Sequence, residues 1–267
     1  AMELSEFYIP KGHRLFAIVS KYDDFLADIE RRPGYKAGDT LKLILHFLKA
    51  FGATDKSMRQ FSRQHLLLVR GAMETLRDIR AIMEAFIIST SYEHYIYSVC
   101  EVVGFPKENV YCTRLNIDRY ELKETEMRTL RILKEEMAKM LMIEIPRNAK
   151  SLSDLSPRNQ ETIKRLDEVF WETLPKMTAG KMLKEVSPVG GRDKAKAIQD
   201  VAVRLGVDLS NVMYVGDSIT DVEPFQMVRE NGGLTISFNG NQYAIREAEI
   251  AVLSNHAVIT TVLADVF

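Results

Sequence analysis

The feature that most constrains the fold is the segment 212–221, a short apolar run that ends in Gly-Asp and is followed by a second aspartate. A brief apolar run closed by glycine is typical of a buried strand. The predicted strand 212–215 would bring Asp217 and Asp221 to its carboxyl end. Because Mg²⁺ prefers hard oxygen ligands, two carboxylates at one strand end indicate a metal-dependent phosphate site.

Strand and helix patterns alternate in residues 77–116 and again from residue 188 onward. This alternation predicts an α/β protein with a doubly wound parallel sheet, which binds ligands at the carboxyl ends of its strands. The predicted strands are 85–88, 110–115, 212–215, 234–238 and 250–253, and the predicted helices are 92–103, 193–205, 222–230, 242–248 and one at the C-terminus.

Two other regions have a helical pattern. Apolar residues recur at three- and four-residue steps from Leu15 to Ile29, and further helices are expected at 39–51, 71–83, 123–142 and 154–171. The opening residues 1–7 resemble the middle of a helix rather than a natural start. The predicted domains are an N-terminal helical cap region (1–76), an α/β core (77–116 and 187–267) and a second helical insertion (117–186).

Composition argues against several classes of protein. The net charge is −1 and no basic stripe alternates with aromatic residues, so nucleic-acid binding is not expected. Cys100 and Cys112 are too few for a disulfide framework, and no Cys/His group has zinc-site spacing. Both are expected to pack as small apolar residues in a reducing cytoplasm. The apolar segment 41–48 is interrupted by Lys42 and His46, so membrane insertion is not expected.

Further polar residues are expected at the same edge of the sheet. Ser89 and Thr90 follow the strand 85–88, and Lys194 opens the helix 193–205. The Ser89 hydroxyl can donate to a phosphoryl oxygen, and the N–H groups of the next two residues would open a helix that attracts an anion. The positive charge of Lys194 would offset the negative charges of the carboxylates and the phosphate. We therefore expect catalytic roles for Ser89 and Lys194, phosphate binding by Ser89, Thr90 and Lys194, and metal binding by Asp217 and Asp221.

This arrangement resembles the haloacid-dehalogenase-like superfamily of phosphohydrolases. Residues 86–89 look like its second motif, Lys194 like its third, and residues 216–221 like its fourth. The resemblance implies a Rossmann-like core with helical caps and a Mg²⁺ cofactor. It also implies hydrolysis of a small phosphorylated molecule through an aspartyl-phosphate intermediate.

A closer resemblance rests on the segments 20–24, 38–41, 89–92 and 237–241. They are similar to an archaeal branch of the superfamily that is labelled subunit R of an energy-converting hydrogenase in methanogens. The label implies an association with a membrane-bound hydrogenase complex and establishes no substrate.

The superfamily reaction needs an aspartate at the end of a first core strand, and the chain shows no such strand. Asp23 and Asp24 come after an apolar stretch, but helical spacing continues past both of them. In the superfamily, the first strand lies between the strands that here precede Ser89 and Asp217. The resemblance therefore places the nucleophile upstream of Ala1 and predicts that these two strands lack their shared neighbour, unless something else fills its position.

Simpler structural interpretations exist for each candidate. Asp217 and Ser89 can merely cap the helices that follow, Lys194 can be a solvated helix residue, and Asn239 can belong to an Asn-Gly turn. His94 lies nearest the predicted pocket and is expected to be structural or solvent-facing rather than part of the site.

Two functions from different classes follow. The first is a cytoplasmic Mg²⁺-dependent phosphatase of a small phosphorylated metabolite, with caps that exclude water and select the substrate. The second is a non-catalytic subunit or regulator associated with a hydrogenase complex. The candidate site residues favour the enzyme for the intact protein, whereas the missing nucleophile favours the second function for these 267 residues.

Overall fold

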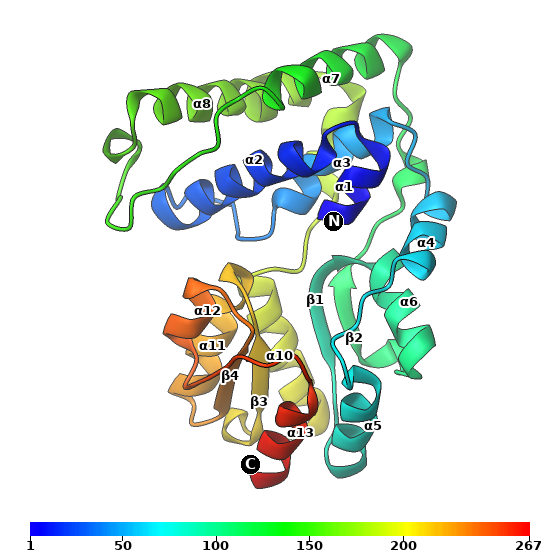
Figure 1. Ribbon diagram of the computed structural model, residues 1–267, viewed down its shortest axis with the longest axis vertical. Helices are drawn as coiled ribbons and strands as arrows, with labels where there is room; N and C mark the ends of the chain where they lie inside the picture. Colours follow the sequence, from blue (N-terminus) through cyan, green and yellow to red (C-terminus); the bar gives the residue numbers. More distant parts are fainter. The chain divides into compact units, whose positions relative to one another are not determined.

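The computed structural model describes residues 1–267, which pack into two compact units (Figure 1). Unit 1 comprises Ala1–Ser62, Ser91–His94 and Thr113–Pro188, and unit 2 comprises Arg63–Thr90, Tyr95–Cys112 and Val189–Phe267. Unit 1 therefore contains most of the two regions that were predicted to be helical. Unit 2 contains the predicted strands that precede the candidate site residues. No helix in the structure combines the length and the apolar character that crossing a membrane requires.

Unit 2 is a mixed α/β unit with two small sheets, which confirms the predicted fold class. In the larger sheet, β3 pairs with β4 and β4 with β5, and both pairs are parallel. The smaller sheet contains β1 and β2. The elements of this part of the chain are α5 (Ala72–Ile82), β1 (Ile87–Tyr92), α6 (Glu93–Val103), β2 (Val110–Thr113), α10 (Arg192–Leu205), β3 (Met213–Gly216), α11 (Val222–Glu230), β4 (Leu234–Phe238), α12 (Gln242–Glu247), β5 (Ile250–Val252) and α13 (Val258–Val266).

The strands β1 and β3 belong to different sheets, so they lack a shared neighbour, as the sequence analysis predicts. All of β1 except Tyr92 is only half-buried, and Tyr214 is the one buried residue of β3. β3 is also an edge strand of its sheet. The prediction of buried strands here is wrong, because burial of a strand depends on neighbours that its own sequence does not specify.

The end of β1 also differs from the prediction. The strand runs to Tyr92 and α6 begins at Glu93, so Ser89 and Thr90 lie inside the strand. The N–H groups of Thr90 and Ser91 therefore do not open a helix. The predicted strand end relied on the change from apolar to polar residues, but β-branched threonine and aromatic tyrosine are both favoured in strands.

Cys100 and Cys112 pack as expected. Both are buried, and they lie in an apolar cluster of unit 2 that also contains Ile96, Phe105 and Val110.

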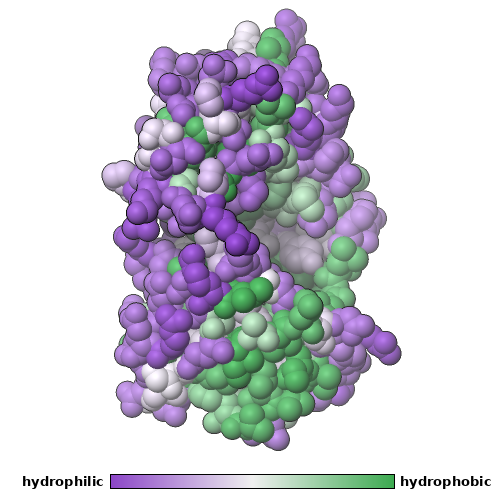
Figure 2. All heavy atoms as spheres, turned by 60° about the vertical axis from the view of Figure 1, so that its left-hand side comes forward, coloured by the Kyte–Doolittle hydropathy of each residue, from purple (hydrophilic) through white to green (hydrophobic).

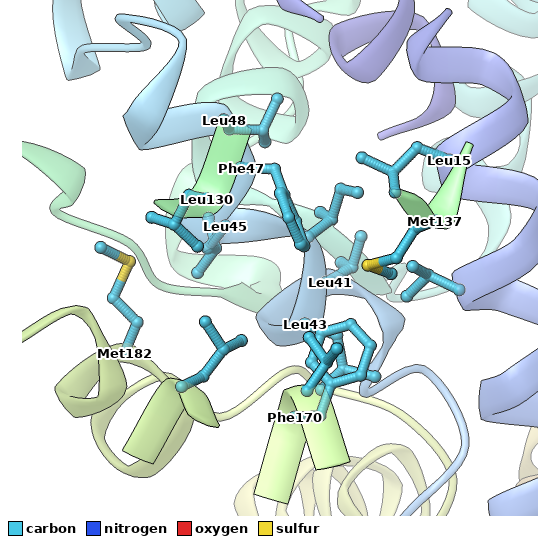
Figure 3. Packing of buried hydrophobic residues seen from close by; sticks show 14 of the residues in the cluster. Leu15, Leu41, Leu43, Leu45, Phe47, Leu48, Leu130, Met137, Phe170 and Met182 are labelled. Carbon is cyan, nitrogen blue, oxygen red and sulfur yellow. The ribbon is translucent and has the colours of Figure 1, made fainter. Parts of the chain in front are cut away.

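Unit 1 consists of helices around one hydrophobic core (Figure 3). From α3, Leu43 and Phe47 are fully buried, and Leu130 and Met137 of α7 pack into the same cluster. Because α3 is buried on almost every side, most of its residues are apolar, and Lys42 and Lys49 are the two that are not buried. The helices are α1 (Met2–Tyr8), α2 (Gly12–Asp24), α3 (Thr40–Ala50), α4 (Asp55–Gln64), α7 (Glu124–Met137), α8 (Pro157–Asp167) and α9 (Lys181–Glu185), and α2 and α8 continue as the π-helices Phe25–Ile29 and Glu168–Thr173.

Several helices of unit 1 depart from the sequence pattern, and α9 was not predicted. The helix α4 was not predicted, because only Met58 and Phe61 of its residues are buried apolar side chains. The helix α7 ends at Met137 rather than at residue 142. The predicted helix 154–171 begins later, at Pro157, where the Ser156 side chain caps the helix by accepting from the Asn159 N–H.

Asp23 lies inside α2, so the prediction of a helix through this aspartate is confirmed. Asp23 is 3% exposed, and its carboxyl oxygens accept hydrogen bonds from the Tyr35 hydroxyl (2.6 Å) and from the backbone N–H groups of Gly38 (3.0 Å) and Thr40 (3.1 Å). Asp23 therefore links α2 to the segment that leads into α3. It does not follow a strand, as a nucleophile of the expected kind would.

Candidate active site

The centre of the candidate site is the turn after β3. The strand pairs in parallel register with β4, with Gly216 opposite Ser237, and ends at Gly216. A β-carbon built on Gly216 would lie 2.6 Å from Cγ of Asp221, closer than any real contact. Glycine is therefore required here because the Asp221 carboxylate packs directly against the backbone.

Asp221 forms a buried ion pair with Lys194. Lys194 lies in the first turn of α10, and its Nζ donates to Oδ1 of Asp221 at 2.7 Å. Both side chains are almost completely buried. Burial alone would raise the pKa of Asp221, but the charge and hydrogen bond of Lys194, with the other donors, hold it below the ordinary value. Lys194 is therefore not a solvated helix residue.

The second oxygen of Asp221 closes the turn. Oδ2 accepts from the backbone N–H groups of Asp217 (3.0 Å) and Ser218 (3.0 Å) and from the Ser218 hydroxyl (3.2 Å). Oδ1 accepts from Lys194 and also from the Tyr214 hydroxyl, at 2.6 Å. An ionised carboxylate offers about four lone-pair sites. These donors therefore fill the hydrogen-bonding capacity of Asp221.

A backbone hydrogen bond joins the same two elements. The N–H of Gly191, at the start of α10, donates to the carbonyl of Thr220 at 3.0 Å. Gly191 has a positive φ of 49°, and the helix it opens ends at Gly206, as the sequence predicts. Lys194 is thus held beside the turn by its own helix as well as by its charge.

Asp217 is placed differently from Asp221. Its side chain is exposed, while its main-chain carbonyl accepts from the Asn241 N–H at 2.8 Å. The pKa of Asp217 is raised, because surrounding protein atoms desolvate the carboxyl and because Asp221 adds a negative charge; Lys194 acts in the opposite direction. A cation beside Asp217 would relieve this repulsion, so the carboxylate fits the role of a hard-metal ligand.

Replacing Gly216 by alanine is expected to lower the free energy of unfolding by about 2–3 kcal/mol, because the new methyl group overlaps the Asp221 carboxylate. Gly104→Ala is the control, since Gly104 has a positive φ but open space around it, and its cost is about 1 kcal/mol. Chemical denaturation of both variants measures the difference. Equal losses would contradict the close approach of Asp221.

The structure brings Lys194, Asp217 and Asp221 together in unit 2. Ser89 and Thr90 lie on β1, in the other sheet of that unit, and their phosphate-binding roles remain predictions. Asn239 belongs to a turn, as the simpler interpretation held: its φ is 51°, and its side chain bonds both the N–H and the carbonyl of Ser254. In unit 1, His94 pairs with Asp55 at 2.7 Å and is buried, so of the two expected alternatives it is structural and not solvent-facing.

Two residues of the site were missed in the sequence. The sequence pattern indicates only a place in the strand 212–215 for Tyr214 and only membership of the segment 216–221 for Ser218. The signal for Ser218 was present, because Ser218 and Asp221 have the spacing of a capping box, which the structure contains. Nothing local in the sequence distinguishes Tyr214 from an ordinary strand tyrosine.

The unit therefore has two aspartates after the carboxyl end of one parallel strand, the edge at which such sheets bind ligands, and a lysine of α10 beside them. The profile of the haloacid dehalogenase-like hydrolases matches residues 68–262, and the chain belongs to this family. Its structure is similar to that of gene product AF1437 from Archaeoglobus fulgidus, with a TM-score of 0.85 and 27% sequence identity over 100% of this chain and 77% of that one. A search of curated proteins gave no match.

Proposed function

We propose that the intact protein is a Mg²⁺-dependent phosphatase that acts on a small phosphorylated metabolite. The observation that carries the proposal is the pairing of Lys194 with Asp221 beside the exposed Asp217 carboxylate, in a chain of this hydrolase family. Lys194 attracts the negative phosphate, and Asp217 would hold the metal. Bound Mg²⁺ would supply positive charge to the phosphoryl oxygens. Because the bonds of Asp221 are filled, we assign it to positioning rather than to direct metal binding, contrary to the sequence-based expectation.

The nucleophile in this proposal is an aspartate on a strand that precedes residue 1. The separate sheets of β1 and β3, the edge position of β3 and the half-buried state of β1 support a parallel strand between them. An oxygen of that aspartate would attack phosphorus while the bond from phosphorus to the substrate oxygen breaks, and the leaving oxygen would take a proton from water. Water would then cleave the aspartyl-phosphate and release phosphate.

The test uses the chain extended by its upstream segment, with an aryl phosphate as substrate. Phosphate release is expected with Mg²⁺ and not without it. Asp217→Asn is expected to lower the rate at least about a hundredfold, because an amide replaces the proposed metal-binding carboxylate. Asp208→Asn, an exposed aspartate before β3, is the control and should leave the rate unchanged. No turnover on a broad panel of phosphorylated metabolites would overturn the proposal.

A second candidate function is that of a non-catalytic subunit within a larger assembly. It is favoured by an apolar surface on unit 2, which is visible in Figure 2. On α13, Val258, Val262 and Val266 are 50%, 51% and 74% exposed, and Leu253 before it is 93% exposed. Contiguous exposed apolar surface is typical of sites at which proteins interact. Inactivity of the extended chain together with stable association with hydrogenase subunits would favour this function.

A further inference from the structure

Tyr214 occupies an unusual position for a hydroxyl group. It lies in the middle of β3, opposite Thr235 of β4, and is 7% exposed. Its ring packs edge-on against Phe225 of α11, with 5.4 Å between the ring centroids. A phenylalanine would fill the same space, and burying a hydroxyl is unfavourable unless it finds a partner. The partner here is Oδ1 of Asp221, at 2.6 Å.

The hydrogen bond from Tyr214 is one of several that fix the orientation of the Asp221 carboxylate. Lys194 and Tyr214 both donate to Oδ1 of Asp221, one from α10 and the other from β3. The N–H groups of Asp217 and Ser218 donate to Oδ2, so the other end of the carboxylate holds the turn. The donors on the two sides prevent the carboxylate from rotating. The direction of the Lys194 ammonium and the position of the Asp217 backbone are thereby coupled to Tyr214.

We propose that Tyr214 is a positioning residue, whose hydroxyl fixes the Asp221 carboxylate so that Lys194 and Asp217 are held ready for a phosphate and its metal. This inference deepens the proposed phosphatase function and rests on it. Tyr214 would not touch the substrate. It acts through Asp221, and a looser Asp221 would leave Lys194 and the turn free to move by the fraction of an ångström that matters for transfer.

The test compares Tyr214→Phe with the wild type in the chain extended by its upstream segment. The aryl-phosphate kcat is expected to fall about tenfold, with KM changed less than about twofold, because one hydrogen bond to a charged group is lost. The apparent Mg²⁺ dissociation constant, from titration calorimetry, is expected to rise about tenfold as well. A purely structural role would lower the denaturation midpoint without this split between kcat and KM.

Tyr95→Phe is the matched control, since it removes an exposed hydroxyl of unit 2 that donates to the Leu67 carbonyl. It should change neither kcat nor Mg²⁺ binding.

If Tyr214→Phe has the kcat and the Mg²⁺ dissociation constant of the wild type, the positioning role is overturned and the proposed phosphatase function stands. If the wild type binds Mg²⁺ without turnover, the proposed function fails, and a weaker Mg²⁺ affinity of Tyr214→Phe would still support positioning. If the wild type neither turns over substrate nor binds Mg²⁺, both are overturned.

Discussion

Replacing Asp221 by alanine is expected to lower the free energy of unfolding by about 3–5 kcal/mol, the usual cost of leaving a buried charge without its partner. Lys194 would keep its charge in a site where almost none of its side chain reaches water. The Tyr214 hydroxyl and the N–H groups of the turn would lose the same acceptor. Chemical denaturation at neutral pH measures the loss.

The double variant Lys194→Met, Asp221→Ala tests the cause. It should be more stable than Asp221→Ala alone by at least about 1 kcal/mol, because the unpaired ammonium is gone. Lys196→Ala on the same helix is the control, since Lys196 pairs with Asp193 on the surface at 3.6 Å and should cost less than about 1 kcal/mol. A cost for Asp221→Ala no larger than that of this control would mean that the buried pair contributes little.

The stability of the protein is expected to fall as the pH rises from about 4 to 7, and Asp23 is the residue responsible. Burial raises the pKa of Asp23 from 3.8 to about 7, although Tyr35 and the Gly38 N–H act in the opposite direction. Between these two values, the folded state holds a proton that the unfolded state has released. The contribution is therefore complete below the lower value and lost as the pH passes the higher one, by about 4 kcal/mol in total.

Asp23→Asn should remove most of this pH dependence, because an amide does not titrate in this range. The measurement is the free energy of unfolding at several pH values between about 4 and 8. The asparagine variant also loses the acceptor for the Gly38 N–H, which lowers its stability at every pH. The quantity to compare is therefore the slope of the free energy of unfolding against pH, not its absolute value. Glu6→Gln, at an exposed carboxylate of α1, should keep the wild-type slope. Parallel curves for Asp23→Asn and the wild type would assign the titration to another group.

Much of the fold was predictable because its signals are local. The change from strand to helical spacing located α11 and β4 at their observed bounds, and α10 ended at its glycine. The end of β1 was missed, since the polar residues after Ile88 continue the strand instead of closing it. That choice depends on pairing with β2, which lies beyond the reach of any short sequence window.

The site divides in the same way. The sequence by itself determined that Asp217 and Asp221 follow a strand and that Lys194 opens a helix. These signals are local, because the glycine that ends an element and the spacing of apolar residues within it lie a few residues apart. Only the tertiary structure decided that Asp221 gives both oxygens to other donors while Asp217 remains exposed. It also decided that the Tyr214 hydroxyl belongs to the site. Hydrogen bonds between separate elements and the removal of water around a charge arise from packing, and a linear pattern does not encode them residue by residue.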